Sequence, residues 1–180
     1  MKHPARSAAL AVAVVVIVFA VVLALNVGND PQEDAKQSHL VGKAAPSFNL
    51  ANLDGGRVTL ADIAGKSAIV NFWNSWCIPC RQEHDALSAW YAEHKNDPSV
   101  AMVGIVREDT KKAIRSYVAD EKVTWPVGFD PGAKAALDFG TRGQPETYAI
   151  GPDGLVVASK FGPITPQVLD QMVGFAQGTN

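Results

Sequence analysis

Cysteine is scarce in this sequence: the 180 residues include only two, Cys77 and Cys80. A structural zinc site needs about four ligands, and there is no second cysteine pair; His84 is close, but the other histidines show no ligand spacing. A disulfide across so short a loop constrains little of the unfolded chain, so it is a poor structural staple. We therefore interpret the pair as a redox-exchange site, with a metal-binding or inert pair as the alternatives.

Net charge is also small, at −2, which argues against a nucleic acid as partner. The sequence downstream of the N-terminal segment contains no internal repeat and no low-complexity tract. Residues 41–180 are enough for one compact domain and too few for two.

Charge and proline are absent from residues 8–25, an unbroken apolar run. At 1.5 Å per residue such a helix is about 27 Å long, close to the ~30 Å hydrocarbon core of a bilayer. Lys2 and Arg6 precede the run, and acidic residues follow it. The positive-inside rule then places residues 1–7 in the cytoplasm and everything after Leu25 outside.

A cleaved signal peptide is the alternative, but its apolar core is usually ~7–15 residues and ends at a small-x-small cleavage site. We therefore predict that residues 8–25 are an uncleaved, single-pass membrane anchor. The polar residues 26–40 are predicted to be a flexible linker, and residues 41–180 the exported domain. An exported pair of cysteines fits an oxidising compartment.

The cysteines follow an apolar run and form the sequence Trp76-Cys77-Ile78-Pro79-Cys80. Proline is well tolerated in the first turn of a helix, so Pro79 predicts that Cys77 lies at a helix N-terminus. The orphan N–H groups and the macrodipole there favour a thiolate. We therefore predict Cys77 as the exposed, attacking thiol and Cys80 as the thiol that resolves a mixed disulfide.

Hydrophobic patterning predicts a hairpin, then strand–helix–strand–helix, then a second hairpin and a last helix. Thr110 and Thr165 are predicted N-caps. A CxxC where a buried strand enters a helix predicts a thioredoxin-like α/β fold: a central mixed β-sheet flanked by helices, with an N-terminal hairpin extension. The predicted ranges are 47–50, 57–60, 68–73, 100–106, 147–150 and 155–158 for strands, and 79–95, 111–120, 133–139 and 166–176 for helices.

Several stretches resemble the membrane-tethered thioredoxin-like reductases of the TlpA/ResA/CcmG group, namely residues 42–50, 53–55, 70–73 and 76–81. Two more resemble CcmG (DsbE): residues 80–84 match a C-R-x-E-H run, and residues 143–148 match G-x-P-E-T-[FY]. The resemblance covers residues 41 to about 174.

This resemblance implies a reductase that keeps the haem-attachment cysteines of apocytochrome c, or a partner thiol protein, reduced. It implies a membrane thiol carrier of the DsbD/CcdA type as electron donor, and no cofactor or metal. Pro145 matches the family's cis-proline beside the disulfide. Glu146 matches the acidic residue after it, which could accept the Cys80 proton or tune its pKa. Gln144, whose backbone would pair with a substrate strand, departs from the small or β-branched residue usual there.

Three more side chains lie near the cysteines in the sequence. Trp76 is either an apolar lid over Cys77 or an ordinary half-buried aromatic. Glu83 and His84 are predicted to be exposed polar residues of the helix, although His84 could touch the edge of the site. Two alternative functions also stay open: an exported oxidase that inserts disulfides, and a copper-delivery module, against which the short cysteine spacing argues.

Overall fold

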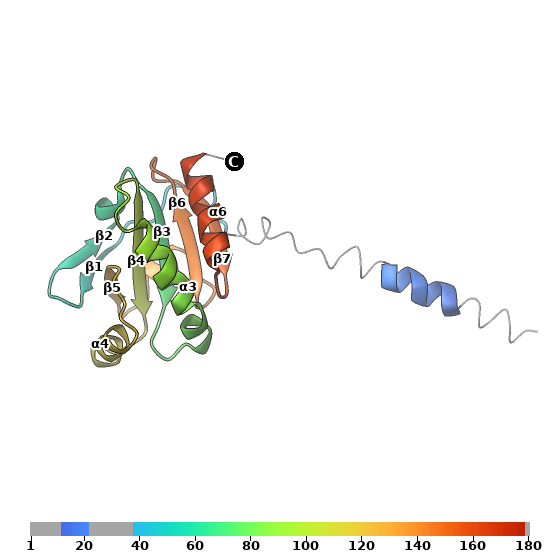
Figure 1. Cartoon of the computed structure of the whole chain (residues 1–180), viewed down its shortest axis with the longest axis horizontal. Coiled ribbons are helices and arrows are strands. Elements are labelled where there is room, and N and C mark those ends of the chain that lie inside the picture. The colour runs from blue at the N-terminus through green and yellow to red at the C-terminus, as the bar shows by residue number, and fades with distance from the viewer. Residues whose placement is uncertain (1–11, 22–37, 179–180) are drawn as a thin grey trace, which may run out of the picture. The chain divides into compact units, whose positions relative to one another are not determined.

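The computed structural model describes residues 12–21 and 38–178, which belong to two separate units. Residues 12–21 are helical, with exposed side chains. The remainder of the predicted anchor, residues 8–11 and 22–25, and residues 26–37 of the predicted linker lie outside the described residues. Within the described ranges, no helix combines the length and apolar character needed to cross a membrane. The fold below is that of residues 38–178 (Figure 1).

A seven-stranded mixed sheet forms the centre of this domain, in the order β2-β1-β5-β4-β3-β6-β7. Strands β3, β4 and β5 are parallel, and the other pairings are antiparallel. The predicted thioredoxin-like sheet with its N-terminal hairpin is thereby confirmed. The strands are β1 (Asn49–Asn52), β2 (Arg57–Thr59), β3 (Ser67–Trp73), β4 (Val100–Arg107), β5 (Val127–Asp130), β6 (Glu146–Ile150) and β7 (Val156–Phe161).

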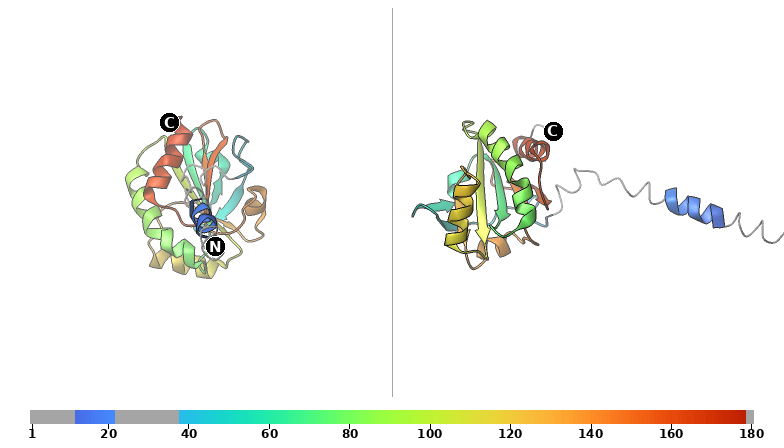
Figure 2. Two further views of the ribbon diagram at one scale, coloured as in Figure 1. Left: turned by 90° about the vertical axis from the view of Figure 1, so that its right-hand side faces the viewer. Right: turned by 60° about the horizontal axis from the view of Figure 1, so that its bottom comes forward.

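Helices cover both faces of the sheet, because strands without a solvent-exposed face need apolar cover on each side. Every residue of β3 is buried. One apolar cluster packs α3, α4 and α6 against the first face, and the other packs η1 and α5 against the second. Figure 2 shows α3 and α6 on the same side of the sheet. The helices are η1 (Leu60–Ile63), α3 (Ile78–His94), α4 (Lys111–Asp120), α5 (Lys134–Asp138) and α6 (Pro166–Gln177).

Both predicted threonine caps are present. Thr110 Oγ1 accepts a hydrogen bond from Ala113 N–H (3.2 Å), and Thr165 Oγ1 accepts one from Val168 N–H (3.4 Å). Each satisfies an N–H group that has no partner inside the helix. The starts of α4 and α6 were therefore readable from sequence.

Two features differ from the sequence-based expectations. Strand β5 was not predicted, because it has only four residues, includes Gly128 and follows Pro126, so it carries no strand pattern of its own. The domain also begins before residue 41: Leu40 is buried in the core, and Ser38 N–H donates to Ser159 Oγ (2.9 Å).

Gly104, in the middle of β4, leaves room for two indole rings. A Cβ atom there would lie 2.7 Å from Trp73 Nε1 and 3.0 Å from Trp125 Nε1. Both indole nitrogens are buried and have no hydrogen-bond partner in the described part of the chain. The close approach of the rings to the backbone therefore requires glycine at this position.

We predict that Gly104→Ala destabilises the domain by about 1–3 kcal/mol, because the added methyl group forces two packed rings apart. Urea unfolding followed by tryptophan fluorescence measures this. Gly132→Ala is the matched control, since a Cβ atom there meets no atom within 4 Å. Equal unfolding free energies for the two variants would contradict the argument.

Candidate active site

The two cysteines lie at the junction between β3 and α3, as predicted. Cys77 is the N-cap of α3, and Pro79 lies in its first turn. Cys77 Sγ accepts a hydrogen bond from Cys80 N–H (3.1 Å), so the sulfur itself satisfies one of the unpaired N–H groups of the helix start. The two sulfurs form a disulfide, with a Cα–Cα distance of 5.2 Å.

Exposure does not distinguish the two sulfurs in this oxidised form. Cys77 and Cys80 are each 4% exposed. The predicted exposure of Cys77 concerns the reduced thiolate and stays a prediction. What distinguishes Cys77 is its place at the helix N-terminus, where a thiolate is favoured. Trp76 and Ile78, on either side of it, are instead 59% and 70% exposed.

Trp76 is fixed by the loop after β4. Its Nε1–H donates to the Glu108 carbonyl (3.4 Å). The residue is more exposed than the half-buried aromatic that was one of its two interpretations. Together with Ile78 it presents an apolar surface beside the disulfide, which is the kind of surface that binds a partner.

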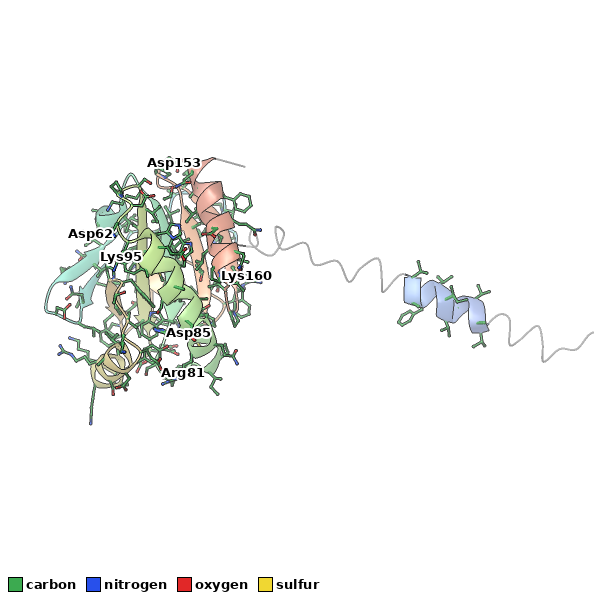
Figure 3. The ribbon with its side chains drawn as sticks, in the orientation of Figure 1. Asp62, Arg81, Asp85, Lys95, Asp153 and Lys160 are labelled. Atoms are coloured by element: carbon green, nitrogen blue, oxygen red, sulfur yellow. A yellow bond between two sulfur atoms is a disulfide. The ribbon has the colours of Figure 1, made fainter. Side chains whose placement is uncertain are left out.

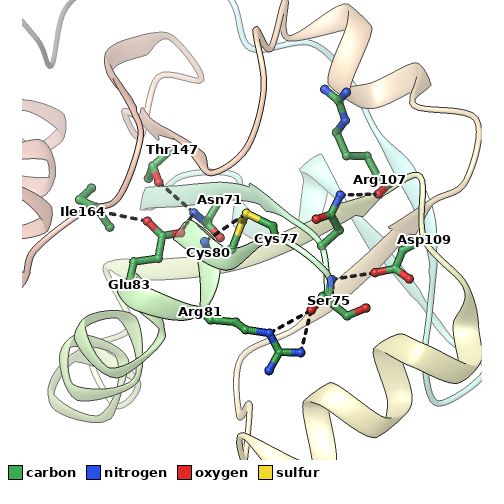
Figure 4. Close-up of a disulfide and its surroundings, with 11 residues drawn as sticks. Asn71, Ser75, Cys77, Cys80, Arg81, Glu83, Arg107, Asp109, Thr147 and Ile164 are labelled. Atoms are coloured by element: carbon green, nitrogen blue, oxygen red, sulfur yellow. Dashed lines mark hydrogen bonds between the residues drawn. A yellow bond between two sulfur atoms is a disulfide. The ribbon is translucent and has the colours of Figure 1, made fainter.

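The carboxyl group of Glu83, three residues after Cys80, is buried, with 1% of the residue exposed. The prediction that Glu83 is an exposed helix residue is therefore wrong. Asn71 Nδ2–H donates to its Oε1 (2.9 Å), and Ile164 N–H donates to its Oε2 (3.0 Å). The same Asn71 amide also donates to Thr147 Oγ1 (3.0 Å). Figure 4 shows this group next to the disulfide.

Burial raises the pKa of Glu83 from its usual value of 4.5 to about 8, while the hydrogen bonds from Asn71 and Ile164 act in the opposite direction. Glu83 therefore holds a proton at neutral pH and can release it just above. A carboxyl group with such a pKa, one helical turn from Cys80, is suited to exchange protons with a thiol.

His84 is also buried, at 5% exposed, against the prediction of an exposed residue. Its Nε2 lies 2.8 Å from the Glu121 carbonyl oxygen and 3.1 Å from Ser88 Oγ. Its ring packs against Tyr117 and Trp125. His84 is therefore buried because α3 packs there against α4 and against the chain that follows α4. Within residues 12–21 and 38–178, no group of three or more potential ligands could hold a metal ion.

The segment from Gln144 to Glu146 enters β6. The Gln144–Pro145 peptide bond is cis, and the Pro145 carbonyl accepts a hydrogen bond from Gly162 N–H (2.9 Å). Glu146 is 1% exposed, and its carboxylate accepts hydrogen bonds from the Arg142 N–H (2.8 Å) and guanidinium group (3.5 Å). Glu146 is thus held by Arg142, and its predicted proton transfer with Cys80 has no contact to support it.

The peptide just before the CxxC is held from both sides. Asp109 Oδ2 accepts a hydrogen bond from Ser75 N–H (2.7 Å). The Arg81 guanidinium donates to the Ser75 carbonyl through two nitrogens (2.8 and 3.2 Å), as Figure 4 shows. These charge-assisted hydrogen bonds hold the backbone of Ser75, two residues before Cys77, in place. Sequence reasoning missed Asp109, because it lies 34 residues from Ser75 and no local pattern links them.

Comparisons with known proteins agree with this geometry. The sequence model of the AhpC/TSA family matches residues 41–159. The thiol-disulfide oxidoreductase ResA of Bacillus cereus is 30% identical over 142 residues, covering 79% of this chain and 80% of the relative. The thiol:disulfide interchange protein HelX of Rhodobacter capsulatus is 35% identical over 148 residues, covering 81% and 80%. A crystal structure of a DsbE-type interchange protein from Chlorobium tepidum has a TM-score of 0.68 at 27% identity, covering 74% and 94%.

The raised pKa of Glu83 predicts a pH-dependent stability. Between pH 4.5 and about 8 the folded carboxyl keeps a proton that the unfolded chain releases. The free energy of unfolding of the oxidised protein should therefore be highest below this window and fall across it, by on the order of 3–4 kcal/mol from this group. Urea unfolding at pH 5 and pH 8 measures the change.

Glu83→Gln should remove this contribution to the pH dependence. Because the new NH₂ group would face the Asn71 or the Ile164 donor, the variant should also be less stable than the wild type at both pH values. Asp85→Asn is the matched control, since Asp85 is an exposed carboxylate on the same helix, and it should retain the wild-type slope. An unchanged slope in Glu83→Gln would show that the carboxyl does not titrate in this window.

Proposed function

Because the chain belongs to the AhpC/TSA family and is a thiol:disulfide oxidoreductase, we propose that it works outside the cytoplasmic membrane as a reductase that passes electrons through Cys77 and Cys80. The observation that carries the proposal is the disulfide at the start of α3 with the buried carboxyl of Glu83 one turn further along. That arrangement supplies a nucleophile, a resolving thiol and a proton acceptor in one place.

The exchange has two steps that balance in atoms and electrons. In the reduced protein the Cys77 thiolate attacks one sulfur of a substrate disulfide, which forms a mixed disulfide and expels the other substrate sulfur as a thiolate. Cys80 then loses its proton to the ionised form of Glu83, which is the minority form at pH 7 and increases toward pH 8, and attacks Cys77 Sγ. The second substrate thiol leaves, and the Cys77–Cys80 disulfide remains. The two electrons are restored by an external dithiol, which becomes a disulfide.

Cys77 is assigned as the nucleophile because its sulfur lies at the N-terminus of α3. The N–H of Cys80 already points at this sulfur, and the helix dipole stabilises the same negative charge. Cys80 lies inside the first turn and next to Glu83, so it gains least from the dipole and most from a proton acceptor.

For the substrate, we propose the Cys-x-x-Cys-His segment of apocytochrome c or a thiol protein that serves it, with a membrane thiol carrier of the DsbD/CcdA type as donor. Support comes from the residues that resemble CcmG, namely 80–84 and 143–148, and from similarity to interchange proteins of the HelX and DsbE type. The exposed Trp76 and Ile78 offer an apolar surface to such a partner. Disulfide insertion is the second candidate, since the same cysteine pair can run in either direction.

We further propose that residues 8–25 anchor the protein in the membrane. Of the predicted linker 26–40, residues 26–37 would connect this anchor to the exported domain, because residues 38–40 already contact the domain. The uninterrupted apolar run and the lysine and arginine before it support this topology.

We predict that Cys80→Ser traps a mixed disulfide with the substrate, because Cys77 still attacks and no second thiol resolves the product. Cys77→Ser should trap nothing. Non-reducing electrophoresis and mass spectrometry of the trapped partner measure this, with the double variant as control. The partner should contain a Cys-x-x-Cys-His segment or serve a protein that does. Trapping by Cys77→Ser instead would reverse the two roles.

The direction of electron flow is tested by the reduction potential of the Cys77–Cys80 couple, measured by equilibration with glutathione or dithiothreitol. A reductase requires a value well below about −120 mV, which is typical of a strong oxidant. A potential near that value, with general secreted proteins as trapped partners, would support the oxidase instead.

The topology predicts that the protein stays in the membrane fraction after high-salt or carbonate washing and is released by detergent. An adsorbed protein held by charge would be released by salt. N-terminal sequencing of the mature protein tests the same claim. A first residue beyond Leu25 would show that the segment is cleaved and would contradict the uncleaved anchor.

A further inference from the structure

The sheet has a gap beside the first half of β4. Strand β4 begins at Val100, but its pairing with β5 begins only at Gly104, opposite Val127. Gly104 N–H donates to the Pro126 carbonyl (2.9 Å). Along a strand, the backbone N–H and C=O groups of successive residues point alternately toward the two neighbouring strands. The N–H and C=O of Met102 therefore point to the same edge of β4 as those of Gly104, which is the edge that faces β5. No strand lies there in the described part of the chain, and the N–H and C=O of Met102 have no ladder partner on that side.

A cavity of about 350 Å³ occupies this gap. Its lining includes Met102, which packs in the cluster containing α3, and Val103, which packs in the cluster on the opposite face. Side chains from both faces of one strand can border the same cavity only at the edge of that strand. The cavity therefore lies in the plane of the sheet, where a further strand would lie, between β4 and the hairpin formed by β1 and β2.

The rim of the cavity is basic. Arg57 and Lys95 line it and form no ion pair within residues 12–21 and 38–178. Lys66 and Asp62 also line it and balance each other in charge. Figure 3 shows Lys95 and Asp62 together, at the opposite end of α3 from Arg81. The floor is apolar, with Val58, Ile63 and Trp90 among its residues.

We propose that this notch, defined by the edge Val100–Val103 and its basic rim, binds an extended acidic peptide segment of a partner protein, which adds a short strand to β4. The unpaired Met102 backbone supplies the donor and acceptor that strand addition requires. Lys95 and Arg57, whose guanidinium also donates to Asn49, carry positive charges that favour carboxylates beside the edge. The apolar floor accepts a small aliphatic side chain. Four residues of strand, about 13 Å, match the unpaired edge.

The notch is separate from the thiol chemistry. Strands β3 and β4 are parallel, so their amino-terminal ends lie together at one end of the sheet. The disulfide lies at the other end, after the carboxyl end of β3. A partner held here leaves Cys77 and Cys80 accessible. Success or failure of this proposal is therefore independent of the substrate proposed for the cysteines.

The test is a titration of the full ¹⁵N-labelled chain in detergent micelles with three acetylated, amidated pentapeptides. The acidic probe is Glu-Val-Glu-Val-Glu, the basic probe replaces each Glu with Lys, and the third carries an N-methyl group on its central residue. The acidic probe should shift the amide resonances of Met102 and Val103 and slow hydrogen exchange at Met102 at least tenfold at saturation. The basic and N-methylated probes should not.

Charge variants locate the binding. Lys95→Glu and Arg57→Gln should each weaken binding of the acidic probe about three- to fivefold. Lys112→Glu is the matched control, because Lys112 is an exposed lysine on α4, and it should bind like the wild type. Exchange of the two cysteines with glutathione disulfide should be unchanged in all three variants.

Three results would overturn the proposal. The first is no shift at Met102 with the acidic probe at about 5 mM, the weak end of specific binding. The second is the same shifts with sodium butyrate at equal concentration, which would assign the notch to small carboxylates. The third is the same shifts on raising the concentration of the protein alone, which would assign the notch to a second copy of this chain.

Discussion

The buried carboxyl of Glu83 is the interaction on which the active site depends. It joins α3 to β3 through Asn71 and to the loop before α6 through the backbone of Ile164. Asn71 extends the connection to β6 through Thr147. An ionised carboxylate without partners would be too costly to bury, and these donors reduce the cost without cancelling it. The pKa of about 8 is the result of that balance.

This balance matters most once the disulfide is reduced. Two thiols and one carboxyl then lie between the N-cap and the second turn of α3. The N-terminus of α3 favours negative charge on Cys77, whereas the interior next to Cys80 disfavours any charge. The Ser75 peptide, two residues before Cys77, is held between Asp109 and Arg81.

The sequence was sufficient for those parts of the fold that local patterns determine. The apolar run of β3, the caps Thr110 and Thr165, and the CxxC at a strand–helix junction were all predicted. Glu83 and His84 were predicted wrongly, because their partners Ile164 and Glu121 lie 81 and 37 residues away. Polar residues at consecutive helix positions resemble a solvated face until tertiary contacts are known. Strand β5 was missed because its pairing with β4, rather than its composition, makes it a strand.

The parallel arrangement of β3 and β4 also explains why the molecule has two different ends. The carboxyl ends of these strands lead into the disulfide loop and the Asp109 loop, so loops from different parts of the chain converge there to hold reactive groups. At their amino ends, β4 pairs with β5 only from Gly104 onward, four residues after β4 begins at Val100. The chain just before Pro126 buries Trp125 beside Gly104. Pro126 has no N–H group to donate back to β4, and the residue before it is committed to the core through its indole ring. The unpaired edge Val100–Val103 thus coincides with a proline and a buried tryptophan in the chain that enters β5.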